Sequence, residues 1–329
     1  MKKNSKLKIA IITSGGDAPG INACIRAIVK TALYNKLNIV GIQHGFEGLI
    51  SGNFIEIDEN MVRNIISLGG TILKSSRSEQ FKTKIGRRLA YEKIIKEKID
   101  FIIIIGGDGS FQGVKEFIKE FDVKFIGIPK TIDNDISNTD VCIGYDTALN
   151  TAMQAIDKIQ DTAGSHERIF IVEVMGRNSG FIALGAGFAN GADSLLIPEI
   201  KNDIISLEHI LQRKKVENDS FIIVVAEGDE NGGAINLLES LKKILPEENI
   251  GICKLGHIQR GGSPSAADRI LASKLGFISV EAILNGKMNC MIGVQNEVIS
   301  YPPFDKICKK YVSINSELTR MISALTYSI

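Results

Sequence analysis

Two glycine-rich turns in this sequence have the residue types and spacing that could bind a phosphate group and a metal ion. Residues 13–20 read TSGGDAPG and residues 106–110 read GGDGS, and each turn directly follows an apolar run. Glycine lets the backbone come close to a ligand, and free amides at the start of the next helix attract anions. The first turn alone could equally be a bare strand-to-helix connection. Because the second repeats its pattern, we interpret both as phosphate-binding turns, with Asp108 as a ligand of Mg²⁺.

A third turn, residues 129–135 (PKTIDND), has two carboxylates, Asp133 and Asp135, after a further apolar run. Phosphoryl transfer from ATP to an alcohol needs a base that accepts the hydroxyl proton. It also needs a metal ion near the transferred group. Asp133 and Asp108 could divide these roles. The alternative interpretation is a cluster of Asx turns in a surface loop.

Two later segments contain basic side chains that could bind a phosphorylated substrate. Arg177 ends residues 173–177 (EVMGR), and His257 and Arg260 lie three residues apart in GHIQRGGSP. The donor fork of a guanidinium suits a phosphate group, although a single Arg is often only a surface ion pair. Together with the three turns, these residues indicate ATP-dependent phosphoryl transfer to a phosphorylated acceptor. They do not by themselves identify the acceptor.

The elements that would position these residues alternate between apolar runs and segments with helical period. The runs are LKIAIIT, LNIVGI, FIIIIGG, KFIGIP, IFIVEVM, SLLIP, FIIVVAEG and GICKLG, and the helical segments are 21–34, 84–98, 111–120, 146–163 and 271–284. Continuously apolar strands alternating with helices predict a parallel, doubly wound α/β architecture. We therefore expect the two glycine turns to face one crevice at the carboxyl ends of strands. We also expect 146–163 to be a long helix that connects two domains.

The start of one helix can be predicted from residue types alone. In GHIQRGGSP, Ser263 is expected to be the N-cap and Pro264 the first residue of the following helix.

Length and composition exclude several other classes of protein. The chain has 329 residues, a net charge of +1 and 39 basic residues without a basic arm, so nothing suggests a nucleic-acid partner. The five cysteines include no CxxC pair, which favours a reducing compartment over disulfides or zinc. The apolar run near the N-terminus is too short for a secretory leader, and no run approaches the about 18 residues of a membrane span. We expect a cytoplasmic protein with no membrane contact.

From about residue 7 to residue 303, the sequence resembles the ATP-dependent 6-phosphofructokinases of bacteria. TSGGDAPG, GGDGS, TIDND, VEVMGR and GHIQRGGSP occur in the order found in that family. The resemblance implies the phosphofructokinase fold, with two Rossmann-like domains and mainly parallel sheets. It assigns residues 1–144 plus 259–308 to a larger domain that binds ATP and Mg²⁺, and 145–258 plus 309–329 to a smaller sugar-phosphate domain. The implied reaction is glycolytic: ATP phosphorylates the C1 hydroxyl of fructose 6-phosphate, giving fructose 1,6-bisphosphate and ADP.

The resemblance also implies residue roles, with Asp133 as the general base and Arg177 and Thr131 as further catalytic residues. Contacts to ATP are expected from Gly16, Arg77, Ser78, Gly107, Asp108, Gly109 and Ser110, with Asp108 at Mg²⁺. Contacts to the sugar phosphate are expected from Thr131, Ile132, Asp133, Arg168, Met175, Gly176, Arg177, Glu227, His257, Ile258, Gln259 and Arg260. Arg168 would reach a neighbouring subunit's active site in a homotetramer.

Several positions depart from the family pattern. Gly251 replaces an Arg that crosses to the neighbouring subunit in relatives, and neither Asn249 nor Lys254 is an obvious substitute, so we expect a raised KM for the sugar phosphate. Ser78 replaces a Phe found in many relatives, which removes packing against the adenine.

The identity of the phosphoryl donor depends on two positions. Lys130 is Gly in the commonest bacterial enzymes and also occurs in pyrophosphate-dependent relatives. Those relatives typically have an acid where this chain has Gly109, and that acid would repel the α-phosphate of a nucleotide. We therefore expect ATP, with pyrophosphate as the alternative donor.

Regulation depends on another set of positions. At the family's site for ADP or phosphoenolpyruvate, Arg26 and Lys30 remain, but most other cations are replaced, by Glu59, Asn60, Asn64, Gln160 and residues 216–218 (VEN). We expect weak or absent regulation by these anions. Two other functions stay open: another kinase of the GGDG superfamily, and a non-catalytic nucleotide-sensing subunit.

Overall fold

The computed structural model describes residues 7–201, 207, 210–211 and 220–326. The chain divides into two compact units. The first comprises Met1–Thr131, Ile136–Asp146 and Arg260–Lys309, and the second comprises Ile132–Asp135, Thr147–Gln259 and Lys310–Ile329. Residues 132–135, which the sequence prediction assigns to the larger domain, thus group with the second unit, where the Lys310 amide donates to the Asp135 carbonyl over 2.9 Å. In the described part of the chain, no helix is both long and apolar enough to cross a membrane.

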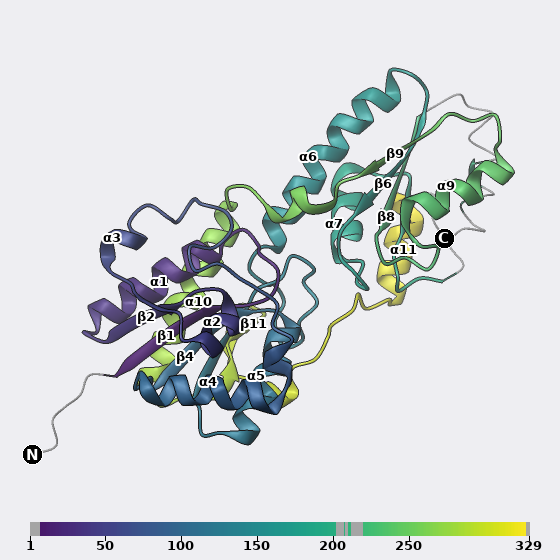
Figure 1. Ribbon diagram of the computed structural model, residues 1–329. Helices are drawn as coiled ribbons and strands as arrows, with labels where there is room; N and C mark the ends of the chain where they lie inside the picture. Colours follow the sequence, from purple (N-terminus) through teal and green to yellow (C-terminus); the bar gives the residue numbers. More distant parts are fainter. Residues whose placement is uncertain (1–6, 202–206, 208–209, 212–219, 327–329) are drawn as a thin grey trace, which may run out of the picture. The chain divides into compact units, whose positions relative to one another are not determined.

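The first unit is built on a six-stranded sheet with the order β10-β5-β4-β1-β2-β3 (Figure 1). The strands are β1 (Lys8–Thr13), β2 (Asn38–Ile42), β3 (Phe54–Glu56), β4 (Phe101–Gly106), β5 (Phe125–Pro129) and β10 (Cys290–Met291). All neighbours are parallel except β2 and β3. The two long runs of isoleucine therefore lie next to each other as β1 and β4, in the middle of the sheet.

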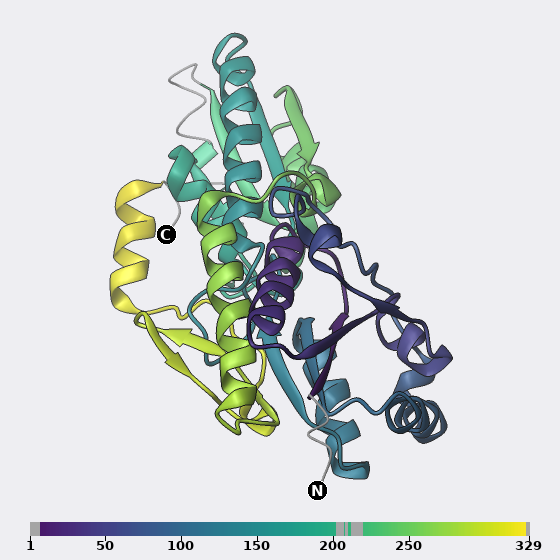
Figure 2. The same cartoon turned by 90° about the vertical axis from the view of Figure 1, so that its left-hand side faces the viewer.

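Helices cover both faces of this sheet, as continuously apolar strands require. Along β1, Ile9 and Ile11 face a cluster formed with α1 (Ile21–Tyr34) and α10 (Ala266–Leu284), which lie side by side in Figure 2. Ala10 and Ile12 face the opposite cluster. That cluster includes residues of α2 (Gly45–Ser51), α4 (Lys84–Lys96) and α5 (Asp108–Glu120). The predicted doubly wound architecture is confirmed.

Short elements complete the first unit. They are the helix α3 (Glu59–Val62), the 3₁₀ turns Gln80–Lys82 and Phe304–Lys306, and an antiparallel hairpin of β11 (Gly293–Gln295) and β12 (Val298–Ser300).

The second unit contains a four-stranded, fully parallel sheet with the order β7-β8-β6-β9. Its strands are β6 (Ile169–Val174), β7 (Ser194–Leu196), β8 (Phe221–Ala226) and β9 (Ile250–Lys254). Its described helices are α7 (Phe181–Asn190), α9 (Gly233–Ile244) and α11 (Ser316–Leu325), and the 3₁₀ turn Gly256–Arg260 follows β9. The long helix α6 (Tyr145–Gly164) begins in the first unit and continues in the second.

The predicted start of α10 is wrong by two residues. Ser265, not Ser263, is the N-cap, and its hydroxyl accepts the Asp268 amide over 3.2 Å. Ser263 instead donates to the Ser67 carbonyl over 2.8 Å and accepts from Arg269 Nη2. These tertiary contacts draw the first serine away from the helix, so the next hydroxyl in the chain takes the cap.

Candidate active site

The two glycine turns lie next to each other at the carboxyl edge of the first unit's sheet. β1 ends at Thr13 and β4 ends at Gly106, on adjacent parallel strands. The Ser14 amide donates to the Ile105 carbonyl over 3.1 Å, and Ser110 Oγ donates to Ser14 Oγ over 2.9 Å. The two turns therefore lie side by side at the carboxyl ends of neighbouring strands, as the sequence predicts.

The second glycine turn leads into α5, and its Gly109 is exposed with empty space beside it. Gly107 is the N-cap of α5, and Asp108 lies in its first turn. A Cβ at Gly109 would have none of the described heavy atoms within 4 Å. The start of α5 is therefore uncrowded beside Gly109, and free amides and the positive end of a helix dipole attract anions at such a position.

Asp108 suits a magnesium ion that is brought by a nucleotide rather than one held by the protein alone. Among the described residues, no group of three His, Cys, Asp or Glu side chains could cage a metal. Mg²⁺ commonly binds one or two carboxylates together with substrate phosphates and water. A half-buried carboxylate beside unblocked amides fits that mode of binding.

The third turn joins the other two through Lys130. Its amide donates to the Gly106 carbonyl over 2.9 Å, so the chain continues beside the second turn after β5 ends. The Lys130 side chain is only 2% exposed, and its Nζ donates to the carbonyls of Ser14, at 3.0 Å, and Gly16. The first unit thus brings together Gly16, Gly107, Asp108, Gly109, Ser110 and Thr131 around three adjacent strand ends.

Arg77 and Ser78 follow a segment that is tied to the first turn. Thr13 Oγ1 donates to the Lys74 carbonyl over 2.6 Å, and Ser75 Oγ donates to the Gly15 carbonyl over 2.5 Å. Ser78 Oγ accepts the Phe81 amide over 3.0 Å, which makes Ser78 a local turn cap. Ser75 was not identified from the sequence, since nothing local marks a serine that binds a backbone 60 residues away.

Arg260 lies against the first glycine turn in the same unit. A methyl group on Gly16 would overlap its guanidinium, so glycine is needed there for this close approach. Arg260 Nε is buried and has no hydrogen-bond partner among the described residues. Both observations fit a side chain whose remaining donors bind an anion.

In the second unit, Asp133 and Arg177 face each other. Arg177 Nε lies 3.7 Å from Asp133 Oδ2, and the exposed fractions of the two side chains are 48% and 5%. The Arg177 amide donates to Glu227 Oε1 over 2.9 Å, and a methyl group on Gly228 would overlap the Arg177 carbonyl. The turns after β6 and β8 therefore fix the backbone of Arg177 while its side chain stays reachable from solvent.

Gln259 supports the neighbouring residues rather than presenting its side chain to solvent. It is fully buried, accepts the Met175 amide over 3.4 Å and donates to the Gly256 carbonyl over 3.0 Å. By contrast, His257 is exposed and Ile258 is 59% exposed. Of the residues predicted to contact sugar phosphate, Ile132, Asp133, Met175, Gly176, Arg177, Glu227, His257, Ile258 and Gln259 all belong to this unit.

Arg168 is the predicted site residue that the structure does not bring to these turns. It directly precedes β6, whereas Met175 and Arg177 follow that strand, and six residues of strand span about 20 Å. Its predicted role in a neighbouring subunit stays a prediction.

Gly251 has a packing role in the second sheet. It lies opposite Phe170 in the β6–β9 register, and a Cβ there would overlap the phenyl ring. Lys254 forms an ion pair with Glu173 at 3.0 Å. Phe170 thus occupies the space beside residue 251, and the charge of Lys254 is already paired within the unit.

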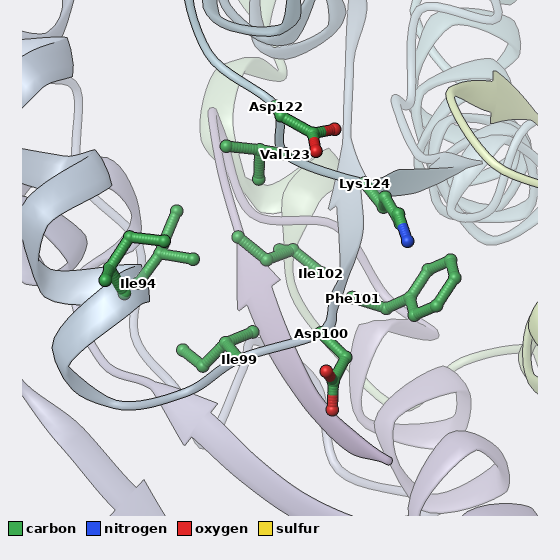
Figure 3. A pocket seen from close by; sticks show the side chains of 9 residues that line it. Ile94, Ile99, Asp100, Phe101, Ile102, Asp122, Val123 and Lys124 are labelled. Atoms are coloured by element: carbon green, nitrogen blue, oxygen red, sulfur yellow. The ribbon is translucent and has the colours of Figure 1, made fainter.

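A separate cavity of about 170 Å³ lies at the other edge of the first sheet (Figure 3). It is lined by residues that include Asp100, Asp122 and Lys124, at the amino ends of β4 and β5. None of the predicted site residues lines it, because those follow the carboxyl ends of the same strands.

The fold defines a class of protein: an α/β protein with mainly parallel sheets, in which ligands commonly bind at the carboxyl ends of the strands. Residues 8–283 match the family described as Phosphofructokinase. The chain is 48% identical over 320 residues to the ATP-dependent 6-phosphofructokinase 2 of Bacteroides thetaiotaomicron, covering 97% of this chain and 98% of that protein. It is 44% identical to the ATP-dependent 6-phosphofructokinase 1 of Thermus thermophilus, with 97% and 99% covered.

Solved structures agree with these matches. The phosphofructokinase of Pichia pastoris in the T-state superposes with a TM-score of 0.85 at 32% identity, over 98% of this chain and 37% of that longer chain. The pyrophosphate-dependent phosphofructokinase of Marinobacter aquaeolei has the same fold at 21% identity, with a TM-score of 0.85 and 97% and 91% covered. This chain belongs to the phosphofructokinase family.

Proposed function

We propose that this chain transfers the γ-phosphoryl group of ATP to the C1 hydroxyl of fructose 6-phosphate, giving fructose 1,6-bisphosphate and ADP. The observation that carries the proposal is the meeting of two glycine turns and the Lys130 turn at one sheet edge, in a chain of this family. Two relatives that are 44% and 48% identical over nearly their full length are named ATP-dependent 6-phosphofructokinases. The open space at Gly109 favours a nucleotide over pyrophosphate as the donor.

The first unit's residues would bind the donor. Amides of the turns that contain Gly16 and Gly107 would receive the phosphates, and Arg77 and Ser110 would add further contacts. Mg²⁺, held by Asp108 and the phosphates, would supply charge neutralisation at the transferred group.

The second unit's residues would act on the acceptor. Asp133 would take the proton of the C1 hydroxyl, since a carboxylate within hydrogen-bond reach of a bound alcohol can act as its general base. Arg177, 3.7 Å from that carboxylate and half-exposed, would steady negative charge as it develops. His257 of this unit, together with Arg260 of the first unit, would bind the phosphate of the sugar.

Replacement of the proposed base tests the catalytic assignment. Asp133→Ser is expected to lower kcat by about 10²–10⁴-fold, with a smaller change in either KM. Asp161→Ser, an exposed carboxylate on α6, is the matched control and should behave as wild type. Unchanged turnover in Asp133→Ser would contradict Asp133 as the base, whereas a wild-type chain that binds ATP without turnover would favour a nucleotide-sensing subunit.

We further propose that the chain works in the cytoplasm as a homotetramer, with Arg168 completing a neighbouring subunit's site. Light scattering gives the mass of the assembly. Mixing of Asp133→Ser with Arg168→Ala subunits should restore activity in hybrids if sites are shared, and no recovery would contradict sharing.

A further inference from the structure

Three successive carbonyls of the first glycine turn accept hydrogen bonds from side chains far away in the sequence. Lys130 Nζ donates to the carbonyls of Ser14, at 3.0 Å, and Gly16. Ser75 Oγ donates to the carbonyl of Gly15, which lies between them, over 2.5 Å. The backbone oxygens of the turn are thus held by donors from two other segments of the same unit.

Holding these oxygens also orients the amides of the turn. In a trans peptide, the N–H of each residue points opposite to the carbonyl of the residue before it. The amides of Gly15 and Asp17 are therefore directed away from Lys130, and the amide of Gly16 is directed away from Ser75. Gly15 has a φ of +84°, and a left-handed residue within a row of amides forms the concave arrangement that binds anions.

Burial strengthens the case for Lys130 as a structural donor to this turn. The side chain is 2% exposed, and a buried ammonium must have hydrogen-bond partners. Two of these partners are the carbonyls of Ser14 and Gly16, which lie on the turn itself.

We propose that Lys130 and Ser75 are positioning residues for the phosphates of the nucleotide. They hold the carbonyls of Ser14, Gly15 and Gly16 and so fix the amides of the turn, and Lys130 is not itself a phosphate ligand. The inference rests on the proposed nucleotide site and explains how a lysine at position 130 serves an ATP-dependent enzyme. The Lys130 ammonium points at the turn's own carbonyls, so its presence does not require pyrophosphate as the donor.

The test compares three variants that retain the donor-binding turns. Lys130→Met removes the ammonium at similar length, and Ser75→Ala removes the single hydroxyl. Lys124→Met is the matched control, since Lys124 directly precedes β5 and Lys130 directly follows it. Lys124 lines the separate cavity of Figure 3. Hydrogen–deuterium exchange of residues 13–20 is measured without ligand, and calorimetry then gives the Kd for Mg²⁺–ATP without sugar.

In Lys130→Met, we expect faster exchange across residues 13–20 and ATP binding weakened by at least about tenfold, as for a lost charged hydrogen bond. In Ser75→Ala, we expect the same changes at about threefold to tenfold. In both, the KM for fructose 6-phosphate should stay within about twofold of wild type. Lys124→Met should match wild type throughout.

Weaker ATP binding in Lys130→Met with unchanged exchange in the free protein would overturn the proposal, because it would make Lys130 a direct ligand. Should Lys130→Met not fold, Ser75→Ala decides: wild-type exchange and wild-type affinity would overturn the proposal. Neither readout needs turnover. Failure of the proposed reaction, seen as ATP binding without phosphorylation of fructose 6-phosphate, is thus distinguishable from failure of this inference.

Discussion

Gly109→Asp is the substitution that tests the choice of phosphoryl donor at a single position. Gly109 is exposed, lies in the first turn of α5 and has open space where a Cβ would be, so the side chain can be added without a clash. Its backbone does not have the positive φ that would strain an L-residue. An acid at a helix N-terminus should stabilise the fold by about 0.3–1 kcal/mol. Stability and ATP binding are therefore expected to change in opposite directions.

The size of the effect on ATP follows from the added charge. One negative charge within about 5 Å of a phosphate group costs about 1–3 kcal/mol at an effective dielectric constant between about 20 and 80. That cost raises the KM for ATP by about 5- to 150-fold. Gly109→Asn, which has the same shape without the charge, should raise it much less.

A coupled assay at several ATP concentrations, together with a melting curve, measures both quantities. A Gly109→Asp enzyme with the wild-type KM for ATP would refute the reasoning. Equal losses in Gly109→Asp and Gly109→Asn would show that space, not charge, decides at this position.

Three further predictions concern stability, thiol reactivity and regulation. Arg87 holds Glu120 through two hydrogen bonds of 2.7 Å, which lower the pKa of that carboxyl; Glu120→Gln should cost about 1–2 kcal/mol in urea unfolding at pH 7. Because folding lowers this pKa, the stabilisation is complete above the unfolded value of about 4.3 and is lost as the pH falls through the lower pKa of the folded state. A cost that does not shrink as the pH falls below that unfolded value would contradict the pairing. Cys308 is exposed, whereas burial raises the pKa of Cys24, Cys253 and Cys290. A thiol reagent at pH 7.5 should therefore label Cys308 rapidly in the native chain and no other cysteine at a similar rate. Rapid labelling of more than one cysteine would contradict this burial. Lys30 forms an ion pair with Glu59 at 3.2 Å, so its charge is already shared with a carboxylate and attracts an anionic effector less. ADP or phosphoenolpyruvate should therefore change the half-saturating concentration of fructose 6-phosphate by less than about twofold. A large change would refute the expected loss of regulation.

The main strands could be predicted because each is a continuous apolar run, and burial on both faces is what produces such runs. β3, β10 and the β11–β12 hairpin were missed. They have only two or three residues each and lie at an edge or outside the main sheets, where no apolar period can develop.

Within the candidate site, local features could also be predicted from the sequence, and long-range contacts could not. The glycine turns could be predicted because they are local, since strand, turn and helix follow one another in the chain. The contacts of Lys130 with Ser14 and Gly16 span 116 and 114 residues. The packing of Phe170 against Gly251 depends on the register between β6 and β9. Such contacts arise only when the sheet brings distant segments together, so residue type and spacing do not reveal them.

The most direct test of the whole account is the initial rate of fructose 6-phosphate phosphorylation by the purified chain with Mg²⁺ and either ATP or pyrophosphate. We expect rapid formation of fructose 1,6-bisphosphate with ATP and little or none with pyrophosphate. Turnover with pyrophosphate alone, or with neither donor, would contradict the proposed reaction.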